Sequence, residues 1–300
     1  MAGPVTIDDP CWICGNSGTT PHAKGAAVDA LTPDDLRISD KRYGLTLPLL
    51  QCDACGFVFA TRKSLPALTA LYAELDDAEY GASAAGRHRQ MAHLLRWAAA
   101  DLPRSARLLD VGAASGILVS EAIALGFESV GVEPSRPLVG RARAEGLEIH
   151  EGVLPHPALA GATFDIVTLI DVIEHVDDPL GLLELCRRHL APGGRLLVVT
   201  PDRGSVAARV LGGRWWHRRL AHVSYFDRAT LTAALRRSGL DPERWARPRW
   251  YFPIGYLATR VLQYVPGLRR TTATAERDEP GGLLVPLNLR DSYAVVARAS

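Results

Sequence analysis

Short apolar runs alternate with amphipathic stretches through the last two thirds of the chain. The runs predict buried strands over residues 107–111, 129–132, 147–150, 164–170 and 195–200. The apolar spacing between them predicts helices over 117–125, 137–144 and 179–190, the last closed by Pro192, Gly193 and Gly194. A helix over 227–238 and a strand over 292–297 follow. This alternation predicts an α/β fold with a doubly wound, largely parallel sheet.

The first hundred residues follow another pattern. Residues 43–59 predict strands that run into and out of a turn, and residues 65–102 predict helices interrupted near Gly81 and Gly86. We therefore expect a small subdomain over 1–62, a helical cap segment over 63–104 and a core over 105–300. An insertion around 203–226 interrupts the core.

Four of the five cysteines form two pairs with identical spacing, Cys11 with Cys14 and Cys52 with Cys55, and each pair is followed by glycine. Two such C-x-x-C-G turns, 37 residues apart, supply the four thiolates of a closed, structural zinc site. A redox-active pair or disulfides are the alternatives, less suited to a reducing cytosol. Cys186, in an apolar helical stretch, is expected to be a buried core thiol.

Charge and hydropathy exclude several classes of protein. The 34 Lys and Arg residues nearly balance the 33 Asp and Glu residues, so no overall field points to nucleic acid or an anionic membrane. The N-terminal MAGPVTIDDP has neither a basic nor an apolar segment, and no stretch is long and apolar enough to span a membrane. We expect a soluble, cytoplasmic protein whose oligomeric state the sequence does not set.

A glycine-containing loop, Leu108-Leu-Asp-Val-Gly-Ala-Ala-Ser-Gly116, joins the strand at 107–111 to the following helix. Glu133 ends the next strand, 21 residues past Gly112. In such a sheet, ligands bind beyond the carboxyl ends of the strands, and an acid at this place accepts hydrogen bonds from ribose hydroxyls.

Three segments together, this loop with its acid, FDIVTLIDVIEHV over 164–176 and LAPGGRL over 190–196, resemble the class I S-adenosylmethionine-dependent methyltransferases. The resemblance covers about residues 105–300 and implies a Rossmann-like, seven-stranded sheet whose last strand, 292–297, is antiparallel. Ala114 stands where the family usually has glycine. The N-terminal cysteine pairs resemble a bacterial subgroup that includes sugar C-methyltransferases, which are longer and carry a further C-terminal domain.

The resemblance also implies a set of cofactor-binding positions. Asp110, Gly112 and Gly116 would border the methionine part of S-adenosylmethionine, and Glu133 would hold its ribose. The loop Gly152-Val153-Leu154 would flank the adenine, and Asp171 would lie beside the amino acid end. The remaining candidates are neighbours in these motifs or in the cap segment: Ala113, Pro134, Tyr80 and Arg87.

Methyl transfer to oxygen or carbon needs a base, and two histidines are candidates for it. His222 precedes the helix at 227–238, in a region that forms part of the acceptor pocket in related enzymes, and His175 follows the strand at 164–170. Alternatively, each histidine is a polar residue whose side chain is hydrogen-bonded to a helix cap or to the backbone. Asp171, Glu174 and His175 could hold a divalent ion on one helical face, as a similar cluster does in quinone-type O-methyltransferases; we expect no catalytic metal.

The insertion holds five arginines over 203–219 together with Trp215, Trp216 and His217. We interpret it as a lid whose tryptophans pack over the active site while the arginines stay solvated. The alternative is a surface that stacks a base and binds phosphate. A small-molecule acceptor with a phosphate or carboxylate group suits either arrangement.

The sequence thus predicts an enzyme that transfers a methyl group to a small molecule, most readily to oxygen of a sugar or other secondary-metabolite intermediate, with S-adenosylhomocysteine as product. Methylation at carbon or nitrogen is the first alternative. The others are an RNA methyltransferase guided by the zinc ribbon, which the neutral charge disfavours, and a cofactor-binding scaffold without turnover.

Overall fold

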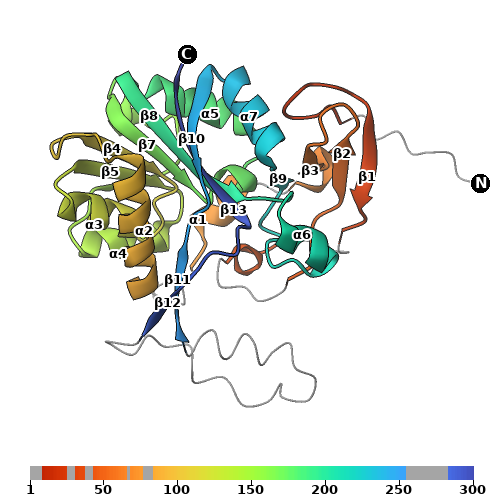
Figure 1. The fold of residues 1–300 in the computed structure, drawn as a ribbon, viewed down its shortest axis with the longest axis horizontal. Helices are drawn as coiled ribbons and strands as arrows, with labels where there is room; N and C mark the ends of the chain where they lie inside the picture. The colour runs from red at the N-terminus through yellow and green to blue at the C-terminus, as the bar shows by residue number, and fades with distance from the viewer. Residues whose placement is uncertain (1–8, 26–30, 38–42, 66–67, 77–83, 255–282) are drawn as a thin grey trace, which may run out of the picture.

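The computed structural model describes residues 9–25, 31–37, 43–65, 68–76, 84–254 and 283–300. Their centre is a seven-stranded sheet in the order β10-β13-β8-β7-β4-β5-β6 (Figure 1). Its strands, in chain order, are β4 (Arg107–Val111), β5 (Glu128–Glu133), β6 (Ile149–Glu151), β7 (Phe164–Ile170), β8 (Leu190–Pro201), β10 (Leu240–Ala246) and β13 (Ser292–Ala299).

Strand direction confirms the predicted fold class. β4 pairs in parallel with β5 and β7, β5 with β6, and β7 with β8. β13 is antiparallel to both of its neighbours, β8 and β10. The order reverses at β4, so the carboxyl ends of β4, β5 and β7 border the crevice where ligands bind in open α/β sheets.

Both faces of the sheet are covered because neighbouring residues on each strand enter different cores. Leu108 packs with helices α2 (Ala84–Ala98) and α3 (Ile117–Ala124), whereas Leu109 packs with α5 (Pro179–Arg188) and α7 (Arg228–Arg237). Continuous apolar strands are the expected sequence of a sheet buried on two sides. A fifth flanking helix, α4 (Arg136–Ala144), packs beside α3.

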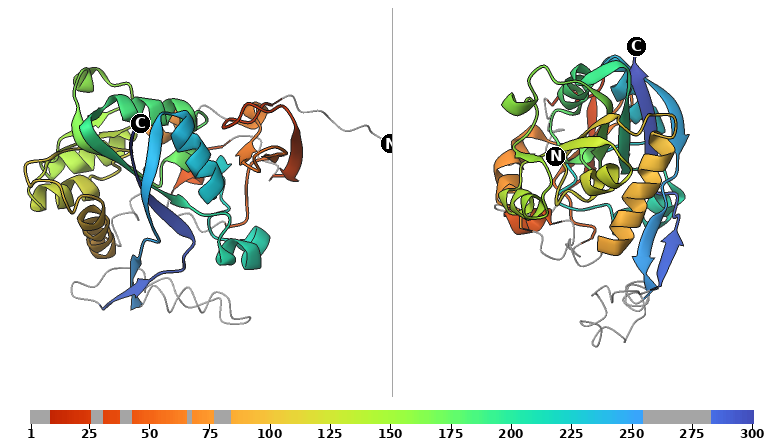
Figure 2. Two further views of the ribbon diagram at one scale, coloured as in Figure 1. Left: turned by 45° about the horizontal axis from the view of Figure 1, so that its top comes forward. Right: turned by 90° about the vertical axis from the view of Figure 1, so that its left-hand side faces the viewer.

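A second sheet, of four strands, lies beside the end of the main sheet (Figures 1 and 2). β1 (Thr19–Ala23), β2 (Leu49–Cys52) and β3 (Val58–Ala60) come from the N-terminal segment. The fourth strand, β9 (Ser224–Tyr225), comes from the insertion after β8 and pairs with β3. The two segments are therefore built into one sheet.

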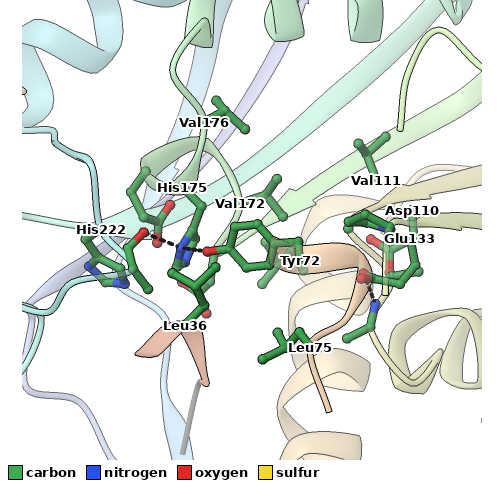
Figure 3. Close-up of a pocket in the computed structure, with 18 of the residues that line it drawn as sticks. Leu36, Tyr72, Leu75, Asp110, Val111, Glu133, Val172, His175, Val176 and His222 are labelled. Carbon is green, nitrogen blue, oxygen red and sulfur yellow. Dashed lines mark hydrogen bonds between the residues drawn. The ribbon is translucent and has the colours of Figure 1, made fainter. Parts of the chain in front are cut away.

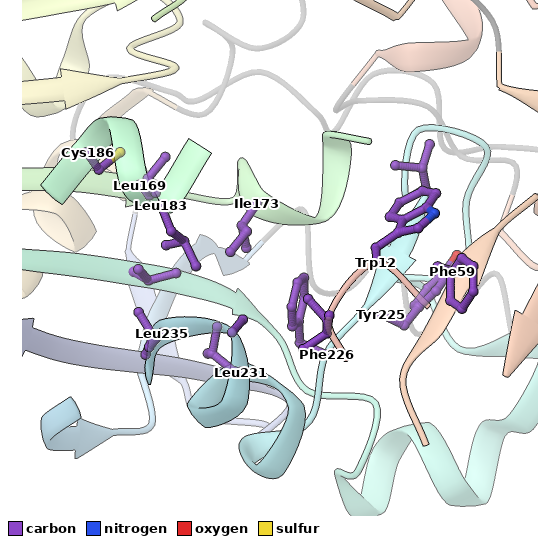
Figure 4. Close-up of a cluster of buried hydrophobic side chains, with 14 of the residues drawn as sticks. Trp12, Phe59, Leu169, Ile173, Leu183, Cys186, Tyr225, Phe226, Leu231 and Leu235 are labelled. Carbon is purple, nitrogen blue, oxygen red and sulfur yellow. The ribbon is translucent and has the colours of Figure 1, made fainter. Parts of the chain in front are cut away.

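Aromatic packing joins this small sheet to the core. Phe57 lies 5.0 Å, centroid to centroid, from Phe226, and Trp12 lies 5.1 Å from Phe59. Figure 4 shows Trp12, Phe59 and Phe226 continuing the apolar cluster that runs from Cys186 on α5. Cys186 is fully buried there, as predicted.

Most predicted helices and strands are found with bounds within one or two residues of those predicted, but four features differ. Helix α5 ends at Arg188, and Pro192–Gly194 lie within β8, since Phe164 of β7 pairs with Leu190. The sequence did not indicate β1, β10 or the hairpin of β11 (Trp250–Pro253) and β12 (Leu284–Leu287). The remaining helices are α1 (Leu68–Ala73) and α6 (Val206–Leu211). No described helix is long and apolar enough to cross a membrane.

Candidate active site

A cavity of about 620 Å³ opens at the carboxyl ends of β4, β5 and β7. Its lining brings together the two groups of residues that the sequence singled out. Figure 3 shows Asp110 and Glu133 at one end, His175 and His222 at the other, and Tyr72 between them. The volume lies in the ordinary range of small-molecule sites.

The loop after β4 is shaped by backbone that only small residues tolerate. Gly112 has φ +79°, and a Cβ placed there would meet Cγ2 of Val172 at 2.5 Å. Ala114, where the family usually has glycine, adopts φ +49°, a conformation that costs free energy in any residue with a side chain. The N–H of Ala114 donates to Oε2 of Glu133 at 2.8 Å, and this bond helps to fix the loop.

Glu133 is held by backbone donors on both carboxylate oxygens. Oε1 accepts from the N–H of Ser135 at 2.8 Å, opposite the Ala114 bond to Oε2. Burial raises its pKa, and these two bonds act in the opposite direction. Each oxygen keeps one lone pair, which is what two ribose hydroxyls require.

Asp110 ends the neighbouring strand and is also buried. Its carboxyl accepts a 2.6 Å bond from Oγ1 of Thr168. Burial raises its pKa to about 7, and the negative charge of Glu133 adds to that shift. Two acidic groups in one water-poor end of a cavity suit a positively charged ligand.

The other predicted cofactor residues fall into three groups. Ala113, Pro134, Val153 and Asp171 line the cavity, as does Arg87. Gly116 does not: it precedes α3, and a Cβ there would meet Cδ1 of Leu147 at 2.5 Å, so glycine serves helix packing. Tyr80 lies outside the described residues.

The groups that line this end of the cavity fit S-adenosylmethionine. The close approach of the backbone at Gly112, the paired lone pairs of Glu133 and the acids flanking the cavity match the cofactor's amino acid end, ribose and positive sulfur. No acidic side chain stands in the Gly152-Val153-Leu154 loop, where backbone and apolar contacts would meet the adenine.

His175 is oriented by two oxygen atoms. Its Nδ1 lies 2.8 Å from the carbonyl oxygen of Ala221 and 2.7 Å from the hydroxyl of Tyr72. Because a carbonyl only accepts, we assign the ring proton to Nδ1, which leaves Nε2 as a bare acceptor. Burial lowers the pKa of His175 to about 4, and the charge of Arg219 adds to the shift, so the ring is neutral at pH 7.

His222 lies against His175 with ring centroids 4.7 Å apart and ring planes at 90°. It is 4% exposed, and burial, followed by the charges of His175 and Arg219, lowers its pKa far below 6.5. Its Nδ1 has no hydrogen-bond partner among the described residues. A buried acceptor without a partner is costly, so this atom calls for a donor from a ligand.

The structure regroups the residues proposed to hold a divalent ion. Glu174, His175 and His222 bring one potential ligand atom each within 4.8 Å of one another, and Asp171 is not in that group. Oε2 of Glu174 accepts from Thr200 at 2.9 Å, while Oε1 has no partner among the described residues. Each of the three residues could supply one ligand atom to a divalent ion. The two imidazoles could equally act as a general base.

Sequence reasoning missed Tyr72, which α1 places over the cavity. Its hydroxyl reaches His175 across 103 positions in the chain. Burial raises its pKa, so the phenol stays protonated, and its oxygen accepts from the Nδ1–H of His175, which the carbonyl of Ala221 shares. Only the helical spacing of Leu68, Tyr72 and Leu75 hinted that one face of this segment meets the core.

The predicted lid needs a correction. Trp216 and His217 do line the cavity, where both contact Oδ2 of Asp291, at 2.8 and 3.2 Å. Trp215 is 2% exposed and packs away from the cavity, since adjacent residues of this turn point in opposite directions. Three of the arginines are not simply solvated: Arg203, Arg218 and Arg219 donate to Gly56, His22 and Arg37.

The four paired cysteines converge at the base of the small sheet. The Sγ atoms of Cys11 and Cys55 lie 3.6 Å apart, those of Cys14 and Cys52 lie 3.5 Å apart, and all four fall within 4.8 Å. A tetrahedral zinc–thiolate site with bonds of about 2.3 Å places its sulfurs roughly 3.8 Å from one another. None of the four cysteines is in a disulfide.

Replacement of Glu133 by glutamine is expected to weaken S-adenosylhomocysteine binding about tenfold or more, because the new NH₂ group would face a backbone N–H. Isothermal titration calorimetry measures the affinity. Glu128→Gln, at the exposed start of the same strand, is the matched control. Equal affinities for the two variants would remove Glu133 from the binding site.

Comparison with known proteins agrees with this geometry. A family model described as a methyltransferase domain matches residues 83–244. Ubiquinone biosynthesis O-methyltransferases of Cereibacter sphaeroides (strain ATCC 17029 / ATH 2.4.9) and Xanthomonas axonopodis pv. citri are 36% and 32% identical over 149 and 155 residues. These alignments take in 45% and 47% of this chain but only 60% and 65% of the relatives' own length.

A solved structure shows the same fold. The complex of the Haloferax volcanii Trm112 methyltransferase activator with a methyltransferase aligns with a TM-score of 0.50 and 20% identity, over 75% of this chain and 99% of that one. Because the family model spans more than half of the sequence, the chain belongs to the methyltransferase domain family, with the fold of the class I S-adenosylmethionine-dependent enzymes.

Proposed function

We propose that this protein transfers a methyl group from S-adenosylmethionine to a hydroxyl oxygen of a small ring-shaped acceptor, with a buried histidine taking the proton. The observation that carries the proposal is one continuous cavity with the Glu133 carboxylate at one end and two neutral imidazoles at the other. When bound, S-adenosylmethionine supplies a methyl group on a positively charged sulfur.

The cofactor end binds and orients. Glu133 would hold the ribose, and the backbone at Gly112 and Ala113 would admit the methionine part. Asp110 and Asp171 add acidic groups on that side; burial raises the pKa of Asp171 to about 6, against the lowering by His217 and Arg87. Correct positioning supplies much of the rate of an in-line displacement.

The histidine end removes the acceptor's proton. A hydroxyl hydrogen directed at Nε2 of His175 or Nδ1 of His222 would satisfy an acceptor that lacks a donor. The proton passes to that nitrogen as the oxygen gains the methyl group, so charge balances within the pocket. Tyr72 and the Ala221 carbonyl hold the His175 ring in the tautomer that this step needs.

Two considerations favour oxygen as the methylated atom. The relatives at 32–36% identity are named for O-methylation in ubiquinone biosynthesis. A base is required for a hydroxyl, whereas a neutral amine needs none. Aromatic side chains of Trp216, Trp250 and Tyr251 line the cavity and suit the face of a sugar or another ring-shaped secondary-metabolite intermediate.

The test uses purified protein, S-adenosylmethionine with an isotopically labelled methyl group, and a panel of hydroxylated sugars and phenols. The proposal expects S-adenosylhomocysteine together with a labelled methyl ether, identified by mass spectrometry and NMR. Label found only on carbon or nitrogen contradicts O-methylation. Binding of S-adenosylhomocysteine without turnover on any acceptor class would favour a scaffold.

The pH dependence of turnover provides a further prediction. A base must be neutral to accept a proton, and the pKa of His175 is lowered from 6.5 to about 4, with that of His222 far below 6.5. We expect kcat to stay level from pH 8 down to roughly pH 5 and to fall as the pH drops further. Asp110 and Asp171 of the same cavity have pKa values of about 7 and 6. A fall near pH 6.5 that Asp110→Asn and Asp171→Asn both retain would therefore show that the working base is not buried.

A matching change is expected in stability. The unfolded chain takes up a proton on His175 below pH 6.5, whereas the folded chain does not until about pH 4. The folded state therefore loses stability as the pH falls through that window, by up to roughly 3 kcal/mol for His175. Urea unfolding at pH 7 and pH 4.5, on wild type and His175→Asn, measures the difference.

A further inference from the structure

A second, smaller cavity lies outside the active site. It measures about 100 Å³, and none of the residues that line it lines the active-site cavity. Five of its lining residues carry hydrogen-bonding groups: His22, Arg203, Trp215, Arg218 and Tyr225. We call this space the donor cavity.

The donor cavity is built between the small sheet and the insertion that packs on it. Val58 pairs with Gln51 on one side and Tyr225 on the other, so these side chains share one face of the sheet. Ala208 of α6 and the buried Trp215 cover that face. Figure 1 shows α6 beside the strand pair β3 and β9.

Positive charge dominates the walls. The pKa of His22 is lowered, first by burial and then by the charges of Arg218 and Arg203. Arg218 donates to Nε2 of His22 at 3.2 Å and has no carboxylate partner among the described residues. Within the described part of the chain, Arg203 pairs with a single carboxylate, Asp227, at 3.3 Å, and also donates to the carbonyl of Gly56.

Two of the lining residues also carry a buried donor that has no acceptor among the described residues. The indole N–H of Trp215 has no hydrogen-bond partner among the described residues. The hydroxyl hydrogen of Tyr225 likewise has no acceptor there, since the nearby backbone group of Arg219 is itself a donor. An unmet buried donor costs about 1–3 kcal/mol, which an oxygen-rich ligand removes.

We propose that the donor cavity binds a phosphate group, either free inorganic phosphate or the phosphate of a monoester. Two guanidinium groups, an indole N–H and a phenol match the acceptor-only oxygens of phosphate. One phosphate fits the cavity, and His22, whose side chain is only partly shielded, marks the side open to solvent. This inference is independent of the proposed methyl transfer.

A phosphate bound in the donor cavity would affect the active site, because several residues that line the cavity are close in sequence to His222. Trp215, Arg218 and Tyr225 flank His222 in sequence, and β1 with His22 lies across the cavity from them. A phosphate bridging these groups would tie the segment that carries His222 to the small sheet.

The experiment titrates inorganic phosphate into the full-length protein by calorimetry, with sodium chloride at matched ionic strength as the reference. NMR follows the pKa of His22, which is expected to rise when an anion offsets the two arginines. Arg218→Gln is expected to weaken phosphate binding about tenfold or more. Arg188→Gln, on the exposed side of α5, is the matched control.

The outcomes separate clearly. Saturable phosphate binding that Arg218→Gln weakens and Arg188→Gln does not supports the site. Absence of binding beyond the chloride reference overturns it, as does equal binding by both variants. Trp215→Phe, which removes one buried donor while keeping an aromatic side chain, provides the same comparison if Arg218→Gln fails to fold. Phenyl phosphate then distinguishes the sources: binding equal to that of phosphate identifies a monoester site, and exclusion identifies free phosphate.

Discussion

His222→Asn is expected to lower kcat by roughly 10²- to 10⁴-fold, the usual contribution of a positioned general base. The ring is 4% exposed, its Nδ1 has no partner among the described residues, and it contacts His175 edge to face. Asparagine keeps a polar side chain of smaller size, so the variant removes the basic nitrogen while disturbing the packing modestly.

Two measurements make this result interpretable. S-Adenosylhomocysteine affinity should stay within about twofold of wild type, because Glu133 and Asp110 lie at the other end of the cavity. His175→Asn, measured alone and together with His222→Asn, tests whether the two rings act as one unit, in which case the losses are not additive. Full turnover by both single variants would contradict a histidine base.

Removal of metal from the four cysteines is expected to abolish turnover as well as to unfold the N-terminal segment. We propose that Cys11, Cys14, Cys52 and Cys55 hold a structural zinc ion, and the spacing of their sulfurs carries this proposal. The segment is too small to fold on its apolar area alone, so metal binding would supply its folding free energy.

The effect on turnover follows from the chain next to His222. The N–H of Val223 donates to the carbonyl of Glu174 at 2.9 Å, and its carbonyl accepts from the N–H of Ala60 at 2.7 Å. β9 then pairs with β3, which follows the second cysteine turn. Loss of the cysteine site would therefore release the loop that places His222 beside His175.

Elemental analysis is expected to find one zinc ion per chain, and Cys52→Ser to lose it. Chelation should lower kcat far more than it lowers S-adenosylhomocysteine affinity, since the cofactor end rests on the main sheet. Cys186→Ser changes a buried thiol outside the cluster and should keep the zinc. A metal-free wild type with full thermal stability would contradict the site.

Much of the main sheet could be read from the sequence because its signals are local. The apolar run of β7 was predicted with its observed bounds, and Asp227 caps α7 through a 2.9 Å bond to Thr230. Periodic burial and end capping act within a few residues, so they leave a pattern in the chain.

The sequence also predicted which residues stand at the ends of the strands that border the cavity. Glu133 and the loop at Gly112 lie at the expected strand ends, because parallel strands bring their carboxyl ends to one edge. The paired cysteines converge as their spacing implied. In each case a short motif carries residues whose types and intervals already define a geometry.

Other features depend on contacts between distant segments. β10 is polar at Asp241 and Glu243 because it is an edge strand, and such a strand lacks a buried pattern. β9 has two residues and exists only because β3 offers it a free edge. The same packing directs Trp215 away from the active-site cavity and Trp216 into its lining.

The histidine end of the cavity belongs to this second class. Tyr72, His175 and His222 come from three segments, and the pKa values of the two imidazoles are lowered by burial and by the charge of Arg219, which only the fold brings beside His175. The sequence by itself determined the sheet, the cofactor loop and the cysteine pairs, since these rest on short-range patterns. Only the tertiary structure decided which side chains meet and how much water remains, because desolvation and long-range contacts exist only once the chain is packed.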